Sequence, residues 1–145
     1  MIETIRVSDR LSVGGQPNEG DLDQLAERGF RAVINLRRDA EANLPISPEA
    51  ERAHAESAGL AYRRLPIRAT GLRPHQVEAF RRIAESLPCP IYVHCGAGNR
   101  ASAISILAEG LGETADAELL EAARQGIAVP GRDVKAFVRR HFGGV

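Results

Sequence analysis

Residues 91–102 contain the side chains of this 145-residue chain that are best suited to chemistry. An apolar, β-branched run ends at His94 and Cys95, a glycine-rich loop follows, and Arg100 stands at the start of a helix-forming segment. A cysteine at a strand end, the free amides of a helix start and a guanidinium can together bind an oxyanion and attack it. The pattern predicts cysteine-based phosphoryl or sulfur transfer.

The loop after Cys95 is built to surround an anion. The backbone N–H groups of the loop precede the expected helix or lie in its first turn, where N–H groups have no partner within the helix. They belong to Gly96, Ala97, Gly98, Asn99 and Arg100. Glycines 96 and 98 permit a positive φ, which would turn successive N–H groups toward one ion. The same field favours the thiolate form of Cys95, and the planar guanidinium of Arg100 can hold two oxygens.

Two other interpretations apply to the same residues. A lone cysteine at a strand end is usually a buried packing residue. Residues 96–101 also fit the G-x-G-x-x-A fingerprint of dinucleotide-binding folds. That fingerprint stands late in this chain, and no strand ending in an acidic residue follows about 20 residues later, as the dinucleotide fold requires. Thiolate chemistry on an oxyanion is therefore the stronger hypothesis.

The elements that must position this loop alternate between strands and helices. Strands are expected over residues 4–7, 11–14, 32–36, 61–65 and 91–94, and helices over residues 18–28, 47–58, 74–87, 99–111, 114–125 and 131–142. Asn18 and Ser47 suit helix N-caps, and Gly29 suits a helix end. This order predicts an α/β fold with a mainly parallel central sheet of about four or five strands flanked by helices. Ligands of such sheets bind beyond the carboxyl ends of the strands, where Cys95 lies.

Composition narrows the class of protein. The length predicts a single domain, residues 1–145, and 19 basic against 19 acidic residues argue against nucleic-acid binding. No apolar run approaches the roughly 20 residues of a membrane span, and no signal peptide is evident. We expect a cytoplasmic protein that needs neither metal nor other cofactor, with no disulfide framework and with Cys89 packed at the entry of a strand. Oligomeric state stays open.

Several segments resemble a known family. Residues 94–100 resemble the signature loop of dual-specificity and tyrosine phosphatases. Residues 11–17, 29–37 and 62–67 are similar to the bacterial beta-lactamase-hydrolase-like, protein-tyrosine-phosphatase-like family, and the resemblance covers residues 2–140. It implies a cysteine-phosphatase-like fold with a phosphate-binding P-loop at a strand end. The implied substrate is a phosphorylated small molecule or a phosphoprotein.

The resemblance also implies roles for individual residues. Cys95 would be the nucleophile that forms a phosphocysteine intermediate. Arg100 and the amides of residues 96–100 would hold the phosphate. His94 would sit behind the cysteine and orient the loop, although a buried core histidine explains it equally well. Ser102 could assist departure of the thiolate, but its position is shifted.

Two features depart from the wider phosphatase pattern. Four residues instead of five separate Cys95 from Arg100, a spacing found in many rhodanese-type sulfurtransferases and often in the bacterial family itself. The segment that usually supplies a general-acid aspartate, residues 66–73, contains no carboxylate. The nearest substitutes are Asp39 and Glu41 in the loop after residues 32–36, with His75 as a further candidate.

Three functional hypotheses follow. The first is a cysteine-dependent phosphatase, weak on poor leaving groups because general-acid catalysis is typically worth about 10²–10⁴-fold. The second is a sulfurtransferase or persulfide-handling protein that uses Cys95. The third is a catalytically weak or inactive module that binds oxyanions.

Overall fold

The computed structural model describes residues 2–38, 44–68, 74–96 and 99–108. Its strands are β1 (Ile5–Arg6), β2 (Leu11–Gly14), β3 (Ala32–Asn35), β4 (Ala61–Arg64) and β5 (Ile91–His94), and its helices are α1 (Glu19–Glu27), α2 (Pro48–Ser57), α3 (Pro74–Ser86) and α4 (Asn99–Ala108). These elements lie close to the bounds expected from the sequence. The helices expected over residues 114–125 and 131–142 fall outside the described residues.

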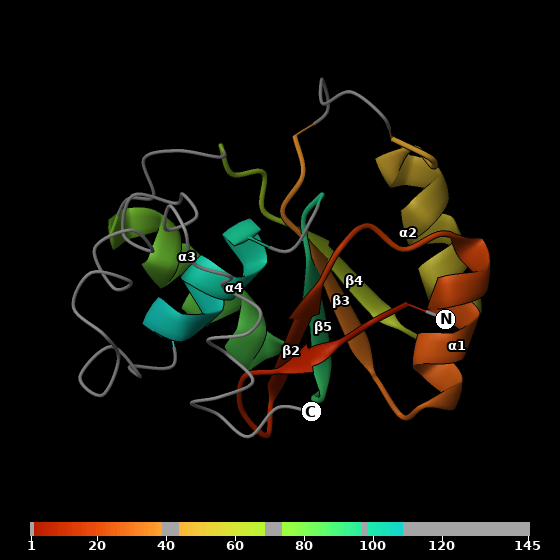
Figure 1. The fold of residues 1–145 in the computed structure, drawn as a ribbon, viewed down its shortest axis with the longest axis horizontal. Coiled ribbons are helices and arrows are strands. Elements are labelled where there is room, and N and C mark those ends of the chain that lie inside the picture. The colour runs from red at the N-terminus through yellow and green to blue at the C-terminus, as the bar shows by residue number, and fades with distance from the viewer. Residues whose placement is uncertain (1, 39–43, 69–73, 97–98, 109–145) are drawn as a thin grey trace.

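The sheet has the order β1-β2-β5-β3-β4, with β5 at its centre (Figure 1). Strands β2, β5, β3 and β4 are parallel, and only the short β1 pairs antiparallel with β2. The prediction of a mainly parallel sheet is confirmed. The register pairs His94 with Gly14 on one side and with Asn35 on the other. The segments that follow β2, β5 and β3 therefore begin at one level, on one edge of the sheet.

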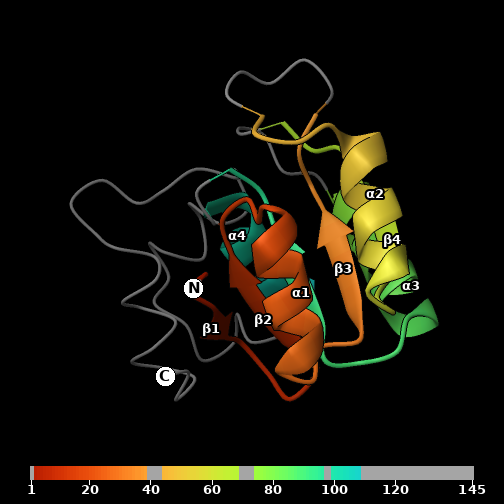
Figure 2. The same ribbon diagram turned by 90° about the vertical axis from the view of Figure 1, so that its right-hand side faces the viewer.

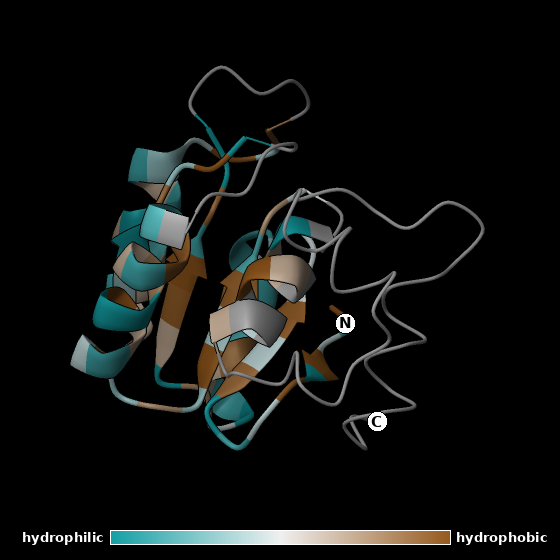
Figure 3. Ribbon diagram, turned by 90° about the vertical axis from the view of Figure 1, so that its left-hand side faces the viewer, coloured by the Kyte–Doolittle hydropathy of each residue, from teal (hydrophilic) through white to brown (hydrophobic). Residues whose placement is uncertain are grey.

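Helices cover both faces of the sheet. Helices α1 and α2 lie on one face, and α3 and α4 lie on the other (Figures 1 and 2). Each face has its own apolar cluster, one containing Leu22, Leu25 and Tyr92 and the other containing Phe80, Val93 and Ile104. The strands between them are mostly hydrophobic (Figure 3), as expected for a parallel sheet buried on both sides.

The predicted helix ends are confirmed by their local geometry. Asn18 accepts a hydrogen bond from the backbone of Asp21, whose side chain bonds back to the Asn18 amide, forming a capping box. Ser47 caps α2 by accepting from the amide of Ala50. Gly29 and Gly59, which follow α1 and α2, have φ values of 98° and 89°, a region that favours glycine.

The prediction that Cys89 packs at a strand entry is wrong. Cys89 is exposed, as are the prolines on either side of it. Residues 88–90 precede the first residue of β5. Their side chains therefore lie outside the part of the sheet that the helices cover. Cys95 and Cys89 are both free cysteines. Within the described residues, no helix has the length and apolar character needed to cross a membrane.

Candidate active site

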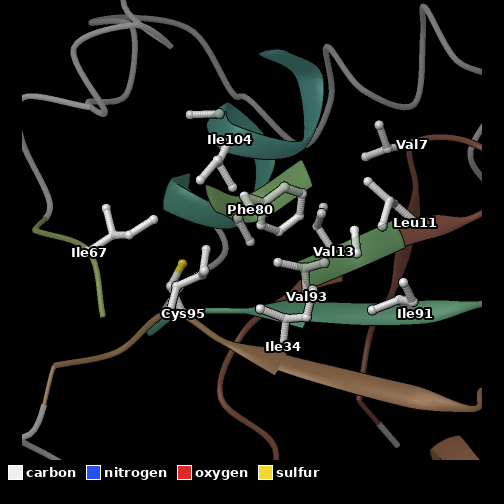
Figure 4. Packing of buried hydrophobic residues seen from close by; sticks show 14 of the residues in the cluster. Val7, Leu11, Val13, Ile34, Ile67, Phe80, Ile91, Val93, Cys95 and Ile104 are labelled. Carbon is white, nitrogen blue, oxygen red and sulfur yellow. The ribbon is translucent and has the colours of Figure 1, made fainter. Parts of the chain in front are cut away.

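Cys95 directly follows β5 and is 1% exposed. Side chains alternate between the faces of a strand, so Val93 and Cys95 join the cluster under α3 and α4, whereas His94 faces α2. Figure 4 shows the Cys95 sulfur among the side chains of this cluster, near Ile67. Cys95 therefore lies at the carboxyl edge of the sheet, as the sequence predicted, and its thiol is buried.

Two arginines approach the start of the loop. A Cβ atom placed on Gly96 would lie 3.8 Å from Cζ of Arg37 and 3.9 Å from Nη2 of Arg100. Arg100 also donates from Nη1 to the carbonyl of Ile67 at 2.8 Å, which holds its side chain against the segment that follows β4. Arg37 is 6% exposed. Two guanidinium groups thus border the backbone next to Cys95, although the sequence singled out only Arg100.

Gly96 differs from the expectation for the loop. Its φ lies outside the left-handed region, and a Cβ there would make only ordinary van der Waals contacts. Gly96 therefore does not adopt the positive φ that a glycine permits. The chain leaves the strand without a left-handed turn at this residue, so the glycine provides open space between the two guanidinium groups.

Glu51 of α2 stands at the centre of a buried hydrogen-bond network behind Cys95. It is 1% exposed. Its Oε2 lies 2.6 Å from Nε2 of His94, its Oε1 accepts from Nε2 of Gln16 at 2.7 Å, and Tyr62 also hydrogen-bonds to the carboxylate. Nδ1 of His94 lies 3.3 Å from the carbonyl oxygen of Cys95. The network therefore reaches from α2 to the backbone of the nucleophile.

The network continues to Arg37. Nη1 of Arg37 donates to Oε1 of Gln16 at 3.2 Å, and its backbone amide donates to Oδ1 of Asn35 at 2.8 Å. Asn35 also donates to the hydroxyl of Tyr62 at 2.9 Å. Nη2 of Arg64 donates to the carbonyl of Arg37 at 2.9 Å. Groups from β3, β4 and the segment after β2 therefore hold Arg37 in place.

These contacts alter the titration of the buried groups. Burial is the largest influence on Glu51 and opposes its charged form. Hydrogen bonds from His94, Gln16 and Tyr62, with the charge of His94, outweigh burial and hold the pKa of this carboxyl below its usual value. Burial, followed by the charge of Glu51, raises the pKa of Tyr62. Burial, followed by the charge of Cys95, raises the pKa of Tyr92, so both phenols stay neutral.

Other predicted site residues are only partly described. Asp39, Glu41, Ala97 and Gly98 lie outside the described residues. The backbones of Asn99 and Ser102 belong to the first turns of α4, but their side chains also lie outside the description. His75 is exposed near the start of α3.

The sequence analysis did not single out Gln16, Arg37 or Glu51 as site residues. One signal could have found Glu51: Pro48, Glu51 and Ala55 follow the three- and four-residue spacing of a buried helix face, and all three are buried. A carboxylate on such a face is rare unless it is paired. Among the residues that the structure describes, no three His, Cys, Asp or Glu side chains gather as a metal site would require.

Comparison with protein families places this chain among phosphatase-like domains. The family described as "Beta-lactamase hydrolase-like protein, phosphatase-like domain" matches residues 4–113. A beta-lactamase hydrolase-like protein of Xylella fastidiosa is 35% identical over 108 residues, which are 74% of this chain and 25% of that protein. One from Agrobacterium fabrum is 29% identical over 110 residues, or 76% of this chain and 26% of that protein. The chain thus spans about a quarter of the length of these curated relatives.

Solved structures share the fold. A proposed phosphatase of Neisseria meningitidis superposes with a TM-score of 0.72 at 22% identity, covering 94% of each chain. A proposed phosphatase of Shewanella putrefaciens gives 0.69 at 23% identity, covering 96% of this chain and 91% of that one. A TpbA variant of P. aeruginosa in complex with phosphotyrosine gives 0.62 at 18% identity, covering 99% and 92%.

Proposed function

Since the chain belongs to the phosphatase-like domain family of beta-lactamase hydrolase-like proteins, we propose that it is a cysteine-dependent phosphatase acting on a phosphomonoester. The observation that carries the proposal is the approach of both Arg37 and Arg100 to Gly96, the residue after the buried Cys95. Two fixed positive charges beside a thiol suit the binding of a doubly charged phosphate.

The reaction has two steps. The Cys95 thiolate attacks phosphorus, the bond from phosphorus to the substrate oxygen breaks, and the leaving alcohol takes up a proton from a general acid, for which Asp39 is the proposed donor. Water then attacks the phosphocysteine, releases inorganic phosphate and restores the thiolate. The amides of residues 96–100, with Arg37 and Arg100, bind the phosphoryl oxygens as charge moves onto them.

The substrate class is a phosphorylated small molecule or a phosphoprotein. The phosphotyrosine complex of the TpbA variant supports an aryl phosphate as the first probe. An activated aryl phosphate has a good leaving group, so it is hydrolysed even where general-acid assistance is weak.

The decisive test compares Cys95→Ser with Cys89→Ser in p-nitrophenyl phosphate hydrolysis. We expect the Cys95 variant to lose about 10³-fold or more of kcat/KM, because the nucleophile is gone. Cys89 is exposed and precedes β5, so its variant serves as the matched control and retains activity. Equal rates for wild type and Cys95→Ser would overturn the proposal.

The four-residue spacing between Cys95 and Arg100 supports a second candidate, a sulfurtransferase. The same variants are therefore assayed for sulfur transfer from thiosulfate to cyanide, with intact mass spectrometry of the protein. A gain of one sulfur on Cys95 together with cyanide-dependent turnover, and no phosphate release, would assign this activity instead. Phosphate binding by calorimetry with both assays blank would assign a non-catalytic oxyanion-binding module.

A further inference from the structure

We propose that Glu51 is a positioning residue that keeps His94 doubly protonated and thereby favours the thiolate of Cys95. The inference rests on the proposed function only in that the thiolate is the attacking group. It begins from the fact that Glu51 and His94 are 1% and 0% exposed, yet both carry titratable groups. A buried ionisable pair next to a nucleophile calls for a chemical explanation.

The contacts of His94 determine its protonation. Nδ1 faces the carbonyl oxygen of Cys95, which can only accept a hydrogen bond. Nε2 faces Oε2 of Glu51 at 2.6 Å. The same carboxylate also accepts from Gln16 and from Tyr62, which favours its ionised, acceptor-only form. Both ring nitrogens therefore face acceptor oxygens when Glu51 is ionised, and this arrangement suits a ring that carries a proton on each.

The orientation of the pair sets its effect on the cysteine. The imidazolium is bonded to the Cys95 carbonyl, and the carboxylate lies on the opposite ring nitrogen. The positive end of the pair thus lies against the backbone of Cys95, and burial keeps water from screening its effect on the thiol. An attraction of this kind favours thiolate over thiol and moves the midpoint of thiol ionisation to lower pH.

The second oxygen of Glu51 acts on the other side of the site. Oε1 holds the amide of Gln16, whose own oxygen accepts from Arg37. One carboxylate therefore supports both the nucleophile and a guanidinium beside Gly96. Other titratable or charged side chains close to His94 and Cys95 come from β3 and its following segment, β4, β5 and α4, and are Arg37, Tyr62, Arg64, Tyr92 and Arg100.

Glu51→Gln tests the inference with little change of shape. The amide oxygen can accept from Gln16, and the amide NH₂ can donate to Nε2 of a neutral His94 whose Nδ1–H still faces the Cys95 carbonyl. The contacts to Gln16 and His94 keep their hydrogen bonds while the ring loses its charge. Arg37 and Arg100 stay in place, so any change reports the Glu51–His94 pair.

The measurement is the pH dependence of thiolate absorbance near 240 nm, which needs no access of a reagent to the buried sulfur. It is made in a Cys89→Ser background, with the Cys95→Ser signal subtracted. We expect Glu51→Gln to raise the midpoint by about one pH unit, and to move the acidic limb of kcat/KM for p-nitrophenyl phosphate in the same direction. A purely structural role would lower the melting temperature without moving either midpoint.

Asp23→Asn is the matched control. Asp23 of α1 pairs with Nε2 of His54 at 2.9 Å on the surface, so the change again replaces the carboxylate partner of a histidine by an amide. Its thiolate midpoint stays at the wild-type value. A midpoint in Glu51→Gln equal to that of Asp23→Asn overturns the inference.

A second variant covers the case in which Glu51→Gln does not fold. His94→Gln removes the ring charge and leaves the carboxylate, and it also raises the midpoint. An unchanged midpoint there overturns the inference. A shifted midpoint in a protein that hydrolyses no phosphate supports the inference and counts against the proposed phosphatase. Cysteine-dependent hydrolysis with an unshifted midpoint supports the proposed phosphatase and overturns the inference about Glu51.

Discussion

Arg37 is the residue whose placement adds most to the candidate site. Its guanidinium is nearly buried, Gln16 accepts from it, and its Cζ lies within reach of the space above Gly96. A guanidinium held in this way loses little conformational freedom when an anion binds. We therefore assign it, with Arg100, to the binding of the phosphoryl oxygens.

At this scale, Arg37→Met is expected to lower kcat/KM for p-nitrophenyl phosphate by about 10–100-fold, the value of one or two hydrogen bonds to a charged group. It also weakens inhibition by inorganic phosphate. Arg37→Lys keeps the positive charge without the planar guanidinium, so its loss of kcat/KM is smaller than that of Arg37→Met. The adjacent, exposed Arg38 supplies the control, because Arg38→Met changes the same charge outside the buried network. Equal losses for the Arg37 and Arg38 methionine variants would contradict the assignment.

Strand β2 supports the site through the close packing of its last residue. Gly14 pairs in register with His94, and the hydroxyl of Tyr92 donates to the carbonyl of Gly15 at 2.6 Å. A Cβ on Gly14 would lie 2.5 Å from that hydroxyl and 2.8 Å from the backbone oxygen of Glu3. The φ of Gly14 is not left-handed, so backbone conformation does not require a glycine here. The lack of room for a Cβ atom does.

Gly14→Ala should therefore lower the free energy of unfolding by about 1–3 kcal/mol, because neither neighbour can give way easily. Gly20→Ala is the counterpart in helix α1. Its Cβ would meet only Oδ1 of Asn18 at 3.5 Å, and alanine at an exposed helix position gains about 0.5–1 kcal/mol over glycine. Urea denaturation of the two variants and the wild type measures both changes in the free energy of unfolding. A Gly14→Ala protein as stable as the wild type would show that β2 and β5 are less tightly packed than described.

The whole molecule is joined at the carboxyl edge by buried polar contacts as well as by its two apolar clusters. Glu51 links the α2 layer to the sheet through His94, and Tyr62 and Asn35 extend the link across β4 and β3. The pKa of Glu51 is lowered in the folded protein, so the unfolded chain binds more protons near and below pH 4.5. The contribution of Glu51 to the free energy of unfolding is present above that pH, and it is lost as the pH falls through the pKa of Glu51 in the folded protein.

The corresponding prediction concerns acid stability. Between about pH 5 and pH 3 the wild type is expected to lose more unfolding free energy than the double variant Glu51→Gln/His94→Gln, because neither amide has a proton to take up. Chemical denaturation at a series of pH values gives both curves. Parallel curves for the two proteins would show that Glu51 keeps an ordinary titration in the folded state.

Local signals account for most of the fold. The caps at Asn18 and Ser47 and the apolar runs of the strands each depend on neighbouring residues, so the element order and the mainly parallel sheet could be predicted. The open conformation at Gly96 and the exposure of Cys89 could not. They depend on how the chain enters and leaves β5 relative to the helices that pack on the sheet.

The sequence by itself determined that Cys95 ends a strand, that a short glycine-rich loop follows, and that Arg100 starts the next helix. These features are adjacent in the chain, so their chemistry is readable without a fold. Only the tertiary structure decided that Arg37 joins Arg100 beside Gly96 and that Glu51 is bonded to His94. Strand register and the docking of α2 bring these residues together, and both depend on packing between segments far apart in the sequence.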